Sequence, residues 1–115
     1  MGLHLQLAED VRNVTAATAQ DPAEALYVGD WREAAIFVRM HDVATANTLL
    51  RIQAAAIPEE GAFADLPEGS FNTNTPISMK YFTNFGNYLR WRRAWASADA
   101  IGFSIDVYLK RQQQR

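Results

Sequence analysis

One nine-residue segment, IGFSIDVYL at 101–109, constrains the fold more than any other part of the chain. Its large apolar side chains fall at every second position: Ile101, Phe103, Ile105, Val107 and Leu109. A helix would spread these five residues around its circumference. A strand collects them on one face, because successive side chains of a strand point to opposite faces. The segment therefore predicts a half-buried β-strand.

Two more segments show the same alternation. Residues 34–41 place Ala34, Ile36, Val38 and Met40 on one face. Residues 48–56, TLLRIQAAA, place Leu50, Ile52 and Ala54 inward and leave Arg51 and Gln53 to solvent. The polar segment DVATAN separates the two. Two strands joined by a few turn-forming residues predict an antiparallel hairpin.

The rest of the chain adds shorter strands and one long loop. Residues 77–82 and 88–95 are predicted strands with turns after each, and 58–76 is mainly loop with a short edge strand at AFADL, because it holds three of the four prolines. Near the N-terminus, Leu3, Leu5 and Leu7 alternate like a strand, while Leu7, Val11 and Val14 also fit one helical face. We expect a single all-β domain over 1–115, an antiparallel β-sandwich of jelly-roll or Ig-like type with about seven or eight short strands. Residues 1–25 are expected to form an N-terminal arm or edge strand, and 111–115 a flexible tail.

Composition excludes several classes of protein. The chain is 49% hydrophobic and 21% charged, which predicts a packed core rather than disorder. It has no cysteine, so disulfide frameworks, thiolate metal sites and cysteine nucleophiles are excluded. The net charge of −2 argues against a nucleic-acid partner, because nucleic-acid-binding proteins more often carry a clear positive excess. No segment reaches the roughly 18 consecutive apolar residues of a membrane helix, and the first residues lack the features of a signal peptide.

No pattern in the chain predicts catalysis, a cofactor or a metal site. His41 and Asp42 resemble the orienting half of a catalytic pair, but no serine lies in a nucleophile motif. Glu59, Glu60, Asp65 and Glu68 cluster in the long loop. They lack the alternating spacing of a calcium loop, which favours a solvated acidic loop. We expect a protein that is not an enzyme and needs no cofactor.

The run NFGNYLRWRRAWAS, residues 84–97, concentrates arginine and aromatic side chains. On a strand, Tyr88, Arg90 and Arg92 share one face, and the opposite face carries Leu89, Trp91, Arg93 and Trp95. One interpretation puts Leu89 and Trp91 in the core and the arginines in water or over aromatic rings. A second makes the arginines an interface patch for acidic groups on a neighbouring subunit. A nucleic-acid surface would need basic residues along a whole groove.

Four segments taken in order resemble a known group of proteins. They are LYVGDWREAAIFVRMHDVAT, TLLRIQAAA, YFTNFGNYLRWRRA and IGFSIDVYLKR, within about residues 26–111. Together they resemble small β-sandwich structural proteins of tailed bacteriophages and related prophage or gene-transfer particles. The chain departs from that group between the second and third segments. Members of the group often carry a glycine- and aspartate-rich turn with a tryptophan there, whereas this chain has Phe63 before Ala64-Asp65-Leu66 and an added Pro-Glu-Gly.

The resemblance implies a virion component assembled in the bacterial host cytoplasm, of the decoration, head–tail or fibre-associated type. Such a protein binds the major capsid protein, another virion protein or copies of itself, and catalyses nothing. The expected contacts are the loop at 58–76, the outer face of 88–95 and the N-terminal segment. The candidate interface residues are Tyr88, Arg90, Arg92, Arg93, Trp95, Phe63 and Phe71.

A carbohydrate-binding module is the alternative function. β-Sandwiches of that class stack exposed indole and phenol rings on sugar rings, and Trp31, Trp91 and Trp95 are the candidates for such a platform. Solvent exposure of these tryptophans would distinguish this function from the structural one.

Overall fold

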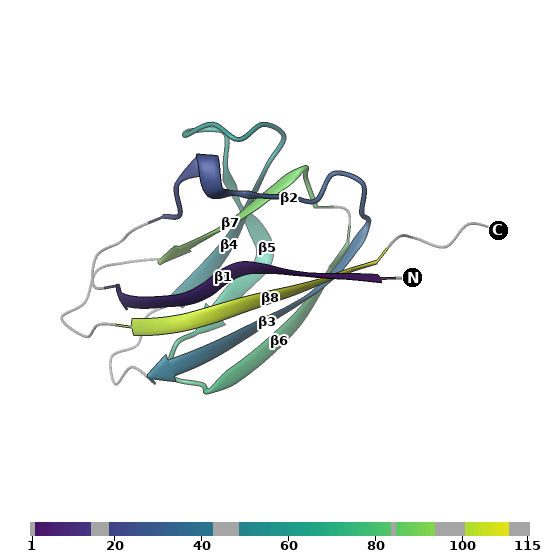
Figure 1. Cartoon of the computed structure of the whole chain (residues 1–115). Coiled ribbons are helices and arrows are strands. Elements are labelled where there is room, and N and C mark those ends of the chain that lie inside the picture. The colour runs from purple at the N-terminus through teal and green to yellow at the C-terminus, as the bar shows by residue number, and fades with distance from the viewer. Residues whose placement is uncertain (1, 15–18, 43–48, 84, 94–100, 111–115) are drawn as a thin grey trace.

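The computed structural model describes residues 2–14, 19–42, 49–83, 85–93 and 101–110. Within them it contains eight strands and one short 3-10 helix, coloured along the chain in Figure 1. The elements are β1 (Gly2–Val14), η1 (Pro22–Glu24), β2 (Leu26–Tyr27), β3 (Glu33–Asp42), β4 (Leu49–Ala55), β5 (Ala64–Asn72), β6 (Ile77–Thr83), β7 (Tyr88–Arg93) and β8 (Ile101–Lys110). The prediction of an all-β antiparallel sandwich is confirmed.

The strands form two four-stranded sheets, which we call sheet A (β1-β8-β3-β6) and sheet B (β2-β7-β4-β5). The antiparallel pairs β1–β8, β2–β7, β3–β6 and β4–β5 are those of one long hairpin whose tip is the β4–β5 connection. That hairpin is rolled up, and the further pairs β3–β8 and β4–β7 join its halves within each sheet. This order is the eight-stranded jelly roll.

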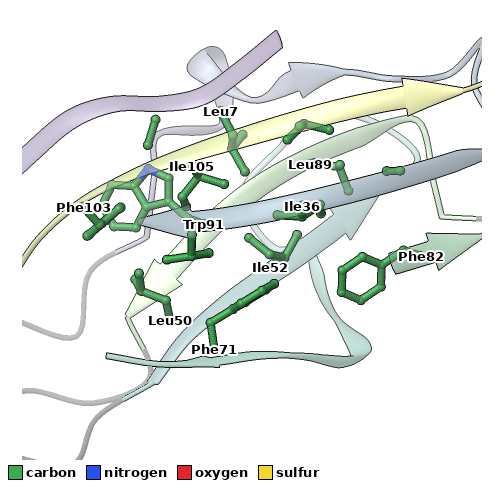
Figure 2. Packing of buried hydrophobic residues seen from close by; sticks show 14 of the residues in the cluster. Leu7, Ile36, Leu50, Ile52, Phe71, Phe82, Leu89, Trp91, Phe103 and Ile105 are labelled. Atoms are coloured by element: carbon green, nitrogen blue, oxygen red, sulfur yellow. The ribbon is translucent and has the colours of Figure 1, made fainter. Parts of the chain in front are cut away.

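The core lies between the two sheets, as the side chains in Figure 2 show. The alternating residues of β8 that define its predicted inner face are all buried. Across the core, the Trp91 ring of sheet B meets the Phe103 ring of sheet A edge to face, with centroids 5.0 Å apart. Burying one such large side chain contributes about 2–3 kcal/mol. The faces predicted for β3 and β8 are therefore confirmed.

The predicted hairpin of β3 with β4 is wrong. β3 pairs with β6 and β8 in sheet A, whereas β4 pairs with β5 and β7 in sheet B. Alternation shows that each strand buries one face, but two strands that face each other across a core satisfy that pattern as well as two paired strands do. The predicted turn between them lies largely at 43–48, outside the described residues.

The long loop predicted at 58–76 contains a nine-residue strand, β5, which extends well beyond the predicted AFADL segment. Pro67 is tolerated there because β5 is the edge of sheet B, where a strand does not need every backbone donor. The pairing of β5 with β4 is irregular between Asp65 and Ser70, and Glu68 within this interval has φ of 59°. From β6, Lys80 Nζ donates to the carbonyl oxygens of Ser70 (2.6 Å) and Glu68 (3.2 Å), which ties the edges of the two sheets together.

At the N-terminus the strand reading is correct and the helical one is wrong. β1 runs along β8 as an edge strand of sheet A, and its register shifts at three places after Gln6. Leu7 and Ala8 reach the core. The predicted turn at 97–100 and tail at 111–115 lie outside the described residues.

Phe71 provides a test of the core. Its side chain is buried between the sheets, so we expect Phe71→Ala to lower the free energy of unfolding by about 3–5 kcal/mol. Ile57→Ala, which shortens a side chain that is half exposed, should change it by less than about 0.5 kcal/mol. Urea denaturation followed by tryptophan fluorescence measures both, and equal small losses would contradict this packing.

Candidate interaction surfaces

The arginine-rich strand β7 does not present its charges freely to solvent. Arg90 is only 4% exposed, because residues of the 57–63 segment cover it. Glu60 accepts from both terminal nitrogens of its guanidinium, at 3.2 and 3.1 Å, and the Phe63 ring lies 4.2 Å from the guanidinium carbon. Arg90 Nε also donates to Gln53 at 2.8 Å. The guanidinium is thus an anchor for the 57–63 segment, with its charge matched inside the chain.

A second carboxylate completes the hydrogen-bonded outer face of sheet B. Asp65 accepts from Gln53 Nε2 at 2.9 Å and from Arg51 Nη1 at 3.0 Å. The hydrogen bond from Gln53, followed by the contacts with Arg51 and the charge of Arg92, lowers the pKa of Asp65 below its ordinary value. Gln53, predicted to face solvent, is only 5% exposed because it links Arg90 to Asp65. Arg51, Asp65, Gln53 and Arg90 are therefore connected by hydrogen bonds within the chain.

The interface residues predicted on sheet B are divided by burial. Phe71 and Arg93 are 1% and 0% exposed, so neither can touch a partner in this structure. The prediction missed this because Arg93 follows the inward alternation of Leu89 and Trp91, and because Phe71 was assigned to a loop. Four candidates keep some exposed surface or lie outside the described residues: Tyr88, Arg92 and Phe63 are half-buried, and Trp95 is not among the residues described.

The tryptophan platform expected for sugar binding is not present on the described surface. Trp91 is a core residue against Phe103, and Trp31 is half-buried and packs against the core cluster. Trp95 lies outside the described part of the chain. The expectation is wrong for Trp91, because alternation turns its indole inward.

The outer face of sheet A has a different character. Its register aligns side chains in rows across the four strands, since residues directly opposite in an antiparallel pair share a face. One row holds His4, Tyr108, Ala35 and Tyr81, and the next holds Gln6, Asp106, Phe37 and Met79. Outer rows add Lys110 and Glu33 at one end and Arg39 and Ile77 at the other. We call this surface the A face.

Large apolar side chains on the A face are exposed. Ile77, Met79, Tyr81 and Tyr108 are 62%, 53%, 55% and 49% exposed, and the two tyrosines are separated only by Ala35. Strand β6 turns Ile77, Met79 and Tyr81 outward, while Ser78 and Lys80 share the inward side with buried Phe82. Shallow hollows between Phe37, Tyr108 and Ile77 and beside His4 mark the same surface. A clustered exposed apolar surface of this kind is a candidate site of interaction with another molecule.

Polar contacts fix the aromatic rings of the A face. Asp106 accepts from Gln6 at 3.2 Å and lies 3.1 Å from His4 Nε2. The His4 ring stacks on Tyr108 with centroids 4.4 Å apart, and Phe37 meets the same tyrosine edge to face at 5.7 Å. Tyr81 donates a hydrogen bond to Glu33, and this bond raises the pKa of Tyr81 above its ordinary value. The rings are held in place before any partner binds.

The A face is not among the surfaces predicted from the sequence. Alternation predicts only that the second face of each strand meets solvent, and it gives ISMKYF no direction. The signal was present in β6, where Ile77, Met79 and Tyr81 alternate with Ser78 and Lys80. Alternation alone would suggest that Ile77, Met79 and Tyr81 are buried. The register of β6 with β3 places these three residues on the exposed face.

The described residues contain no group of three or more histidine, cysteine, aspartate or glutamate side chains arranged to hold a metal ion. None of the helical structure in the described part of the chain is long and apolar enough to cross a membrane.

Comparison with known proteins identifies a fold but no family. No family model matches the chain, and no curated protein matches it. Among solved structures, the chain is similar to one from the disulfide-linked pili of Bacillus endospore appendages, with a TM-score of 0.51 and 11% sequence identity. The match covers 96% of this chain and 89% of the other. At this identity the likeness concerns the fold.

The contact between Glu60 and Arg90 predicts how stability depends on pH. The hydrogen bond and charge of Arg90 lower the pKa of Glu60 below the ordinary 4.5, so the contact stabilises the protein fully above that pH and less as the pH falls through the lowered pKa. We expect Glu60→Gln to reduce the free energy of unfolding at neutral pH and the deficit to shrink on acidification. Urea denaturation at a series of pH values measures this.

Glu59→Gln is the matched control, because it removes the same charge from the adjacent exposed residue. If the two variants lose equal stability at neutral pH, the anchoring of the 57–63 segment by Arg90 is not significant.

Proposed function

We propose that this chain is a structural, non-enzymatic subunit of a repetitive protein assembly and that it docks through the A face. The observation that carries the proposal is the exposure of Ile77, Met79, Tyr81 and Tyr108 on one ordered sheet surface. Leaving large apolar side chains in water is unfavourable by about 25 cal/mol per Å² of apolar area, and a partner that covers them recovers that free energy. On sheet B, in contrast, Arg51 and Arg90 are paired with carboxylates of the chain itself.

The assembly we favour is a bacteriophage-like particle, with the chain bound to the shell or to a neighbouring subunit in the virion. The sequence resemblance over about residues 26–111 supports this, and the jelly roll is a fold shared by many viral capsid domains. The second support is an analogy of fold, and folds host many functions. The proposal of a bacteriophage-like particle therefore depends mainly on the sequence resemblance.

A pilus-like appendage is the second candidate assembly. The solved structure similar to this chain belongs to disulfide-linked pili, which are also repetitive protein assemblies. This chain has no cysteine, so it would assemble without disulfide bonds of its own. Non-covalent contacts such as the A face would have to supply the whole association free energy, helped by the avidity of many repeated contacts.

Fractionation of the source cells tests the proposed function. An epitope-tagged chain should sediment with particles or filaments in many copies, and immunogold electron microscopy would distinguish a virion from a surface filament. A double variant, Ile77→Lys with Met79→Lys, should lose at least about tenfold of this co-sedimentation, because it places two charges in an apolar contact.

Tyr27→Lys with Ile57→Lys is the matched control. It introduces the same two charges at apolar residues that are about as exposed but lie outside the A face, so co-sedimentation should persist. A wild-type chain found only as free protein would contradict the structural role, and equal behaviour of the two double variants would remove the A face from it.

A further inference from the structure

The residues of β3 that face outward follow one another along the A face in an order that complements itself. Reading along the strand, the outward residues are Glu33, Ala35, Phe37 and Arg39, since the residues between them are buried. An acidic and a basic residue therefore mark opposite ends, and a small and a large residue lie between them. When β3 of one copy faces β3 of a second copy that runs in the opposite direction, Glu33 meets Arg39 and Ala35 meets Phe37.

The neighbouring strands keep the same match. In a face-to-face pair related by a two-fold axis across the strands, between the Ala35 and Phe37 rows, the row of Tyr81 and Tyr108 faces the row of Met79 and Asp106. Tyr81 then packs on a methionine, a favourable sulfur–aromatic contact, and the Tyr108 hydroxyl faces a carboxylate that accepts hydrogen bonds. A two-fold interface uses one patch on both copies, so it requires this kind of self-complementarity.

Twist leaves β3 in the best position for such a contact. Two sheets that pack face to face cross at about 30°, so strands near the centre stay in register while edges diverge. β3 is one of the two central strands of sheet A. The charged ends and the size-matched centre thus lie where two copies would remain closest.

The dimensions of the A face match a weak, specific dimer. Four strands spaced about 4.8 Å apart, with same-face residues about 6.8 Å apart along each, give a footprint of roughly 500 Å² per copy. Two copies bury roughly 1,000 Å², which lies at the lower limit of specific interfaces. The net charge of −2 per copy opposes such an approach only slightly.

We propose that the occupant of the A face is a second copy of this chain, packed face to face with the strands of the two A sheets antiparallel and Glu33 of each copy opposite Arg39 of the other. This inference rests on the proposed function for the use of the A face and adds the identity of the partner. Each dimer would be a building unit whose sheet B surfaces and strand edges remain outside the contact.

A charge-swap cycle tests the pairing. Sedimentation velocity from micromolar to millimolar protein should show a monomer–dimer equilibrium. Glu33→Arg and Arg39→Glu should each raise the dimer Kd by at least about tenfold, because each brings like charges together. The double variant should recover most of the loss, because it restores opposite charges in the same places. A monomer at all concentrations, unaffected single variants or a double variant no better than the singles would overturn the proposal.

An intermolecular spin-label measurement tests the orientation without changing either charge. The chain has no cysteine, so Ile77→Cys gives a single labelling site beside Arg39 on the exposed side of β6. In a mixture with isotopically labelled wild-type chain, the nitroxide should broaden amides near Glu33 and Thr83 of the other copy. Broadening centred on Arg39, or none at dimer-forming concentrations, would overturn the antiparallel arrangement.

The two proposals fail separately. A wild-type chain that is monomeric while Ile77→Lys with Met79→Lys still abolishes co-sedimentation would overturn the dimer and leave the structural role, with a different protein on the A face. A dimer that passes both tests in a chain found in no assembly would keep the dimer and overturn the structural role.

Discussion

The structure depends on the pairing of strands that lie far apart in the chain. β1 pairs with β8 and β2 pairs with β7, so each sheet includes a contact between strands that are distant in the chain. Once the rolled hairpin forms, the inner row of β8 becomes fully buried, and its side chains meet those of sheet B. The same register decides which side chains meet in rows on the A face, so the core and the interaction surface share one geometric cause.

That dependence explains what the sequence could and could not predict. Alternation is a local property, so it predicted the strands β3, β4 and β8 and the inner faces of β3 and β8 correctly. On β4 it assigned Gln53 to solvent, whereas the structure buries this residue. Pairing is not local, and proximity in sequence wrongly suggested a β3–β4 hairpin. The part of β5 beyond the predicted AFADL strand was missed because Pro67 and the glycines indicated a loop, although an edge strand tolerates them. In a rolled hairpin only its tip pairs adjacent strands, which makes short-range reasoning weakest for this topology.

The outer face of sheet B and the A face show why the A face could not be identified from the sequence. Arg90 lies in the arginine-rich segment 84–97, which was predicted to be an interface. Glu60 and Phe63, some 30 residues earlier in the chain, cover Arg90 and remove it from the surface. Ile77 and Met79 are exposed, because the register of β6 with β3 places them on the face opposite Lys80, which donates to Ser70 of β5. A high density of charged residues in the sequence therefore did not identify the exposed apolar surface.

The contrast between the sheets also suggests how such a subunit divides its tasks. Arg51 and Arg90 of sheet B are paired with Asp65 and Glu60, so a partner gains little by displacing those bonds. The A face holds its rings in place through Asp106 and Glu33, so a partner meets apolar surface whose order is already established. A modest contact area then suffices when the contact is repeated, because preorganised side chains lose little entropy on binding and avidity multiplies a weak affinity. For a chain with no cysteine, this combination of a rigid apolar face and repetition is a physically sufficient basis for assembly.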